Sequence, residues 1–212
     1  MAGGSPAPLA FGAVWFFRMA KSKLRPRGCE VLLGCTLLGM GVLGYFAYRH
    51  LRLPHEIAQN ERLASAALKT LAVAEADFRG NDLDQNGVQD FWTGDVATLA
   101  RLNLIERGVG AADGAPLAPG AGPPVAHHGY YFVAMRWDES ETPREDLRQG
   151  ASKDRHPSKF AFCAYPVKYG VTGRQTFILN EGNTILWRHR EAEPLDHWPS
   201  DQDLRHEWAK GD

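Results

Sequence analysis

The sequence of 212 residues is poor in cysteine and has almost no net charge. Its three cysteines, Cys29, Cys35 and Cys163, are scattered and odd in number, so they predict neither a disulfide framework nor a metal knuckle. Cys163 lies in an apolar stretch, which favours a core residue over a nucleophile. The net charge of −1 gives no reason to expect nucleic acid as a partner. One domain with accessory segments is the simplest organisation for this length.

The sequence also lacks a catalytic signature. No nucleophile elbow is present. His127 and His128 are predicted to begin a strand, where neighbouring side chains face opposite sides, so they should not bind one metal together. His189, His197 and His206 lie in a polar region without metal-ligand spacing. We therefore expect a protein that is not an enzyme and has no catalytic residue.

One long apolar run is present, at residues 31–48, and it contains no charged side chain. As a helix rising ~1.5 Å per residue it would be about 27 Å long, which predicts a transmembrane helix. The leader at residues 1–30 is basic, which favours a single-pass protein of the inner membrane with its N-terminus in the cytoplasm and its C-terminal domain outside. Translation could start at Met1 or at Met19, where a more ordinary basic leader begins.

Residues 49–79 are predicted to form an amphipathic helix, because small and apolar side chains recur every three or four positions. This stripe consists of Leu63, Ala67, Leu71, Ala74 and Phe78. Gly80 and Asn81 are expected to stop the helix. Asp95 is a good N-cap for a second helix at residues 96–107, and the stretch 108–126, rich in Gly, Ala and Pro, is predicted to be a loop.

The C-terminal half predicts strands. Short aromatic and branched runs, separated by turn residues, occupy residues 129–137, 159–167, 174–179 and 184–189. The charged stretch 138–158 is expected to be an exposed excursion, and residues 190–212 a polar tail. The expected fold class is therefore α+β, with the transmembrane helix continuing into an amphipathic helix packed on a small antiparallel sheet in an extracytoplasmic domain at residues 80–189. The aromatic side chains of the strands are read as a sheet core.

This layout is similar to that of type IV pilin-like proteins, in which a basic leader, an apolar helix and an amphipathic helix precede an antiparallel sheet. Gly28 matches the cleavage glycine of that family, but Leu33 stands where a glutamate is usual, and Glu30 falls earlier. The resemblance implies a structural or accessory protein of export or assembly machinery. Its partners would be membrane lipid and either further copies of itself or pilus and secretion components.

A second resemblance rests on two blocks of sequence. The phrase "FWTGD" at residues 91–95 and the pattern "YP..YG.TG..TFI.NE" at residues 165–181 are similar to an uncharacterised family of membrane-anchored or exported bacterial proteins, associated with planctomycetes. No activity follows from this resemblance. The alternative to an assembly role is a membrane-tethered binding module or hydrolase with its site on the sheet, which predicts a concave pocket with converging polar groups.

The stretch "NDLDQNGVQDFWTGD" at residues 81–95 matches much of a calcium loop. Oxygen ligands at the template positions would come from Asp82, Asp84, Asn86, the Val88 carbonyl and Asp90. Gly87 occupies the turn position, but Thr93 stands where the template has a bidentate glutamate; Asp95 or Asp77 could take its place. A loop with one carboxylate too few would bind Ca²⁺ weakly. The alternative is a polar turn in which Asp and Asn satisfy backbone donors without metal.

Overall fold

The computed structural model describes residues 27–118, 120–139, 154–190 and 192–211, and in the first helix it describes side chains from Gly34 onward. The chain divides into two compact units, Met1–Phe46 and Ala47–Asp212. Most of the predicted leader, including Met1 and Met19, lies outside the described residues. Most of the charged excursion expected at residues 138–158 lies outside them as well.

The prediction of a transmembrane helix at residues 31–48 is wrong. Helix α1 (Arg27–Ala47) covers this region, but no helix of the described residues is long and apolar enough to cross a membrane. The described side chains of α1 are those of residues 34–47. Four of these positions are glycine, which adds no apolar side chain, and Arg49 and Arg52 follow the helix.

The second unit is organised around one long helix. A π-helical segment, η1 (Tyr48–Arg52), leads into α2 (Leu53–Asn81). Helix α2 has a proline in its first turn, a position at which proline is favourable although it has no N–H. The predicted stripe is buried along α2 except for Leu63, which is half-buried. The helix ends two residues later than predicted, because Asp82, rather than Gly80, adopts the left-handed conformation at its C-terminus (φ 46°).

The predicted antiparallel sheet is present and forms a meander. Its strands follow the spatial order β2 (Tyr130–Ala134), β5 (Ala161–Pro166), β6 (Gln175–Asn180), β7 (Leu186–His189) and β9 (Ala209–Lys210). Every neighbouring pair in this sheet is antiparallel. The α+β class and the four predicted strand regions are therefore confirmed, and β9 is an additional edge strand from the predicted polar tail.

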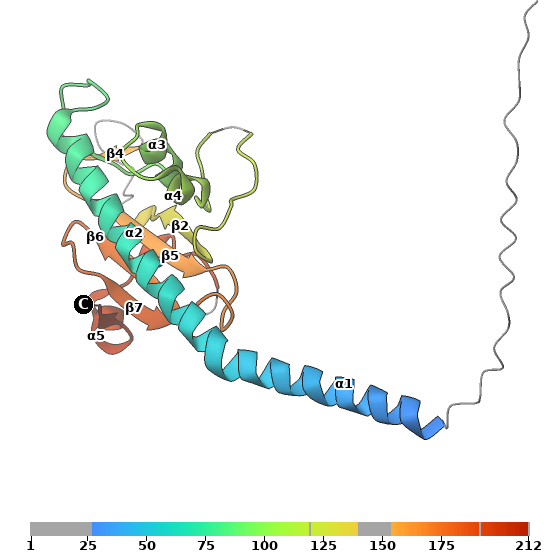
Figure 1. The fold of residues 1–212 in the computed structure, drawn as a ribbon. Coiled ribbons are helices and arrows are strands. Elements are labelled where there is room, and N and C mark those ends of the chain that lie inside the picture. Colours follow the sequence, from blue (N-terminus) through green and yellow to red (C-terminus); the bar gives the residue numbers. More distant parts are fainter. Residues whose placement is uncertain (1–26, 119, 140–153, 191, 212) are drawn as a thin grey trace, which may run out of the picture. The chain divides into compact units, whose positions relative to one another are not determined.

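Both faces of the sheet are covered. Helix α2 lies across β5 and β6 on one face (Figure 1), where Leu68 and Leu71 are fully buried beside Phe162 and Leu179. On the other face a second apolar cluster forms around Cys163 and Ile178. Side chains of the C-terminal tail complete that cluster: Leu195, Trp198, Leu204 and Trp208. The tail is polar, as predicted, but its few apolar side chains cover this second face of the sheet.

Shorter elements surround this frame. Two small two-stranded sheets pair β1 (Phe91–Trp92) with β4 (Arg155–His156), and β3 (Trp137–Glu139) with β8 (His197–Trp198). The short helices are α3 (Val96–Arg101), α4 (Arg107–Ala111) and α5 (Asp201–His206). Asp95 caps α3 as predicted, its side chain accepting the Thr98 N–H at 3.0 Å. Helix α4 lies where a loop was predicted; a Cβ on its Gly110 would lie 2.2 Å from the Ala100 side chain, so glycine lets α3 and α4 approach closely.

The buried stripe of α2 should dominate the stability of this unit. Leu71→Ala is expected to lower the free energy of unfolding by about 2–5 kcal/mol, because it leaves a cavity between the helix and the sheet. Val73→Ala, two residues away on the same helix, is the matched control, because its side chain is 61 % exposed. Chemical denaturation of both variants measures the difference, and equal losses would show that the stripe is not what holds α2.

Candidate functional site

The loop after α2 is organised by the side chain of its first residue. One carboxylate oxygen of Asp82 accepts the Asn86 N–H at 3.2 Å and the other accepts the Gly87 N–H at 3.0 Å. The Asn86 side chain accepts the Val88 N–H at 2.6 Å and donates to Asp84 at 2.7 Å. Gly87 has a φ of 78°, as the template requires of its turn glycine. The polar turn considered for this stretch is therefore present, and its Asp and Asn side chains form hydrogen bonds within the loop.

Two carboxylates lie on the buried side of this loop. Asp90 is only 1 % exposed, and neither of its carboxylate oxygens has a hydrogen-bond partner among the described residues. One oxygen of Asp84 is also buried and unpartnered, while the other forms an ion pair with Arg155 from β4. Burial raises the pKa of Asp90, and the nearby Asp84 raises it further, although Asn86 and Arg155 oppose the shift.

Of the residues considered as a replacement for the missing glutamate, Asp95 is engaged elsewhere. Asp95 is fully buried; besides capping α3, it accepts the Leu117 N–H at 2.7 Å. Thr93 is 2 % exposed, and its N–H bonds to the Asp154 carbonyl in the neighbouring segment. Asp77 has an exposed side chain on α2. Among the described residues, no three or more His, Cys, Asp or Glu side chains are gathered as a metal site.

The "FWTGD" phrase, which follows the loop, makes structural contacts. The Trp92 N–H donates to Glu75 of α2 at 2.8 Å, and the Trp92 indole donates to the Asp95 carbonyl at 2.8 Å. Phe91 packs in the core. A Cβ on Gly94 would lie 2.6 Å from the Trp92 ring, so only glycine fits there. The phrase therefore ties the end of the loop to α2 and to the start of α3.

Glu75 is a fully buried carboxyl on α2. Burial raises its pKa well above the ordinary value, and the hydrogen bond from Trp92 only partly opposes this. Its second oxygen has no partner among the described residues. Since no cation is paired with it in the described part of the chain, the neutral carboxyl is the form that suits this position.

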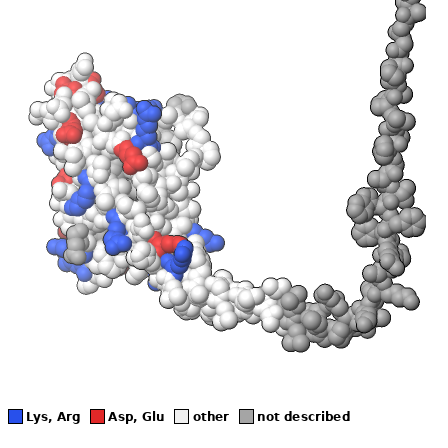
Figure 2. All heavy atoms as spheres, viewed as in Figure 1, with Lys and Arg blue, Asp and Glu red and all other residues white. Residues whose placement is uncertain are grey.

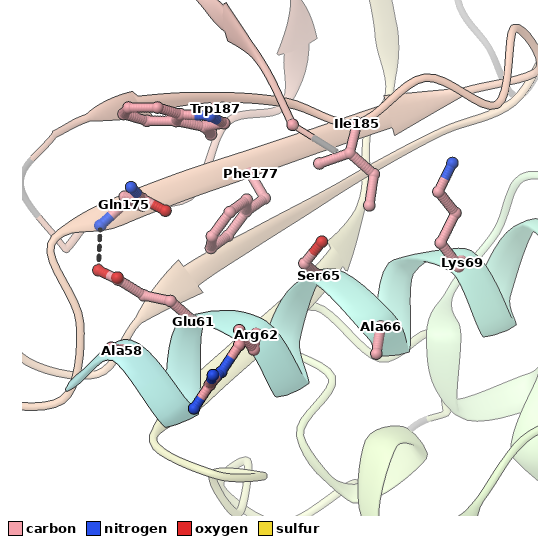
Figure 3. A pocket seen from close by; sticks show the side chains of 11 residues that line it. Ala58, Glu61, Arg62, Ser65, Ala66, Lys69, Gln175, Phe177, Ile185 and Trp187 are labelled. Atoms are coloured by element: carbon pink, nitrogen blue, oxygen red, sulfur yellow. Dashed lines mark hydrogen bonds between the residues drawn. The ribbon is translucent and has the colours of Figure 1, made fainter. Parts of the chain in front are cut away.

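A groove runs between α2 and the β6–β7 part of the sheet, with a volume of about 630 Å³ (Figure 3). Its apolar lining consists of Phe177, Ile185 and Trp187 from the sheet side, together with Ala58 and Ala66 of the helix. Its polar lining consists of Glu61, Arg62, Ser65, Lys69 and Gln175. From the sequence, a pocket with converging polar groups is expected only if the protein is a binding module or hydrolase. The sequence does not indicate which residues line it.

The charged side chains that line the groove differ in the groups to which they are hydrogen-bonded. Glu61 accepts the N–H groups of Arg174 at 2.8 Å and Gln175 at 3.2 Å, so its carboxylate fixes the start of β6. Lys69 donates to the backbone and side-chain oxygens of Asn183, which are uncharged. Among the described residues, no carboxylate forms an ion pair with Lys69 or Arg62. One end of the groove therefore carries a cation without a counter-charge.

The histidines and Cys163 also have defined places. His127 and His128 lie in a turn rather than on a strand, with ring centroids 4.3 Å apart and a left-handed φ of 48° at His128. Burial lowers the pKa of His127, which favours its neutral form. Burial raises the pKa of Cys163 to about 12, as suits the core residue predicted from the sequence. His189, at the end of β7, packs edge-on against Trp187.

The fold and site define an α+β domain in which a long helix and an antiparallel sheet enclose a groove. A family model described as "Protein of unknown function (DUF2950)" matches residues 52–190, about two thirds of the chain, so the chain belongs to that family. The match covers α2 through β7 and ends before the tail that covers the second face of the sheet. No curated protein and no solved structure matches the chain. The predicted membership of an uncharacterised family is confirmed at this level.

Replacing Glu75 with a side chain that cannot ionise should stabilise the protein in a pH-dependent way. A carboxyl whose pKa is raised on folding stabilises the folded state at low pH and loses that contribution as the pH rises through the ordinary value of 4.5 and beyond. We expect Glu75→Gln to raise the melting temperature at pH 7 by several degrees, since each kcal/mol corresponds to about 2–4 °C at this size. The difference should shrink toward pH 4.5.

Differential scanning fluorimetry across this pH range measures the effect. The matched control is Asp77→Asn on the exposed side of the same helix, which should change the melting temperature little at any pH. A Glu75→Gln protein that is less stable than the parent at pH 7 would contradict a neutral, buried carboxyl.

Proposed function

We propose that the protein is a non-enzymatic binding module whose groove takes a small, elongated molecule with an apolar body and an anionic group. The observation that carries this proposal is the pairing of Lys69 with the uncharged oxygens of Asn183 at one end of an apolar groove. An anion placed there would gain a charge-assisted hydrogen bond. In Figure 3, Ser65 and Lys69 point from the helix toward the sheet side chains.

The apolar body of the ligand would lie along the sheet side of the groove. Phe177 and Ile185 are buried at its base, and Trp187 is half-buried at its side. Covering ~100–200 Å² of apolar surface would contribute roughly 2.5–5 kcal/mol, at about 25 cal/mol per Å². Binding costs reduce that gain, so the expected affinity is micromolar to millimolar. Such a site suits reversible capture.

Glu61 lies beside Gln175, at the other end of the groove from Lys69 (Figure 3). Its carboxylate already accepts two backbone N–H groups at the start of β6. Ser65 and Gln175 offer neutral polar atoms along the middle of the groove. The arrangement therefore runs from a hydrogen-bonding middle to a cation at Lys69, which gives a bound molecule a preferred direction.

The pilin-like layout implies a role in export or assembly, and assembly through α2 would need an apolar surface of this helix that is free to pack against neighbouring helices. In this structure the stripe of α2 packs on the protein's own sheet. Figure 2 shows basic and acidic side chains interspersed over the visible face of the second unit. These observations favour the binding module over assembly through α2.

An anionic fluorescent probe tests the groove. The full chain should bind anilinonaphthalene sulfonate saturably with one site, and Lys69→Gln should weaken this binding ~10-fold, since losing one charge-assisted contact is worth about 1.4 kcal/mol. Uncharged phenylnaphthylamine should bind Lys69→Gln and the parent equally. Trp187→Leu should weaken both probes, because both need the apolar side of the groove.

Lys168→Gln is the control, since Lys168 is an exposed lysine outside the groove. Far-UV circular dichroism confirms that the variants are folded, because partly folded chains bind such probes at many sites. Equal weakening by Lys69→Gln and Lys168→Gln, or binding without saturation, would rule the groove out.

A further inference from the structure

We infer that the loop between α2 and β1 binds one calcium ion. The oxygen ligands are the side chains of Asp82, Asp84, Asn86 and Asp90 and the Val88 carbonyl. None of these residues lines the groove between α2 and the sheet. The metal site is thus separate from the proposed ligand site, and each can fail without the other.

Asp90 supplies the decisive observation. A carboxylate that is 99 % buried normally finds hydrogen-bond donors, because an unpaired buried charge is costly. Both oxygens of Asp90 lack a partner among the described residues, and the adjacent Asp84 has a third such oxygen. Arg155 pairs with Asp84 and not with Asp90. Two neighbouring carboxylates therefore have three buried oxygens without a hydrogen-bond donor, and a bound cation would satisfy them.

The charge balance of the loop supports a divalent ion. With metal bound, Asp82, Asp84 and Asp90 would carry three negative charges, and Arg155 forms an ion pair with Asp84. The carboxylate of Asp82 is stabilised by the N–H groups of Asn86 and Gly87, an arrangement that leaves its remaining lone pairs for a metal. A bound ion of charge +2 would cancel the excess of two negative charges.

The ligand set selects calcium over magnesium. It combines carboxylate, amide and main-chain oxygens on an irregular loop, which suits the flexible coordination of Ca²⁺, whereas Mg²⁺ demands near-ideal octahedral geometry. The acidic groups are not gathered as a preformed site, so binding must draw them together. Asp95 is engaged with Thr98 and Leu117, so water would complete the coordination shell. A dissociation constant of about 10⁻⁴ to 10⁻³ M is expected.

Calorimetric titration of the full chain with CaCl₂, and separately with MgCl₂, tests this inference. We expect one calcium site and at least ~10-fold weaker binding of magnesium. In thermal melts, 5 mM CaCl₂ should raise the midpoint by about 2–9 °C relative to a chelator, through preferential binding to the folded state. Asp90→Asn should remove most of the shift, whereas Asp201→Asn, at an exposed position of α5, should keep it.

Asn86→Asp keeps the inference testable should Asp90→Asn fail to fold. It adds a charged ligand at the fifth position of the loop, so it should strengthen calcium binding several-fold while lowering stability in chelator. The inference is overturned if neither the parent chain nor Asn86→Asp shows a calcium-dependent shift. It is equally overturned if Asp90→Asn, when folded, retains the full shift, or if magnesium and calcium act alike.

Discussion

The packing of α2 on the sheet is the constraint on which the rest of the domain depends. Its buried stripe fixes the helix against β5 and β6, and two carboxylates fix its register: Glu61 accepts N–H groups at the start of β6, and Glu75 accepts the Trp92 N–H. The groove lies beside the first of these clamps, and the 82–90 loop follows the second. Both candidate sites are therefore positioned by one helix.

The two sequence phrases that resemble an uncharacterised family have structural roles in this fold. "FWTGD" joins α2, β1 and α3 through Trp92 and Asp95. In the second phrase, a Cβ on Gly173 would lie 2.1 Å from the Tyr130 hydroxyl, and the Thr172 carbonyl accepts a hydrogen bond from Asn60 of α2. Both phrases thus dock the long helix, which gives a physical reason for these residue types without requiring an activity.

The amphipathic helix, the four strand regions and the Asp95 cap could be predicted, because periodicity and capping are local properties. The covering of the second sheet face could not, because Trp198 and Trp208 are isolated apolar residues in a polar tail. The sequence contains one signal of it, the continuous apolar run of β5, which is typical of a strand covered on both faces. In the structure all six residues of β5 are buried. The groove could not be predicted either, because it depends on which positions of α2 face β6 and β7, and that is known only from the folded structure.

The 82–90 loop forms a polar turn from the same residues that we propose as calcium ligands. The sequence template places the oxygens in order, but it does not reveal that Asp90 is buried or that Arg155 from β4 reaches Asp84. These two facts come from the pairing of β1 with β4, which brings Phe91 beside His156 and Trp92 beside Arg155. Hydrogen bonds within the loop satisfy Asp82 and Asn86, so the turn can form without metal. The same bonds leave Asp90 unsatisfied, and for that reason the polar turn and the calcium loop are compatible descriptions of one structure.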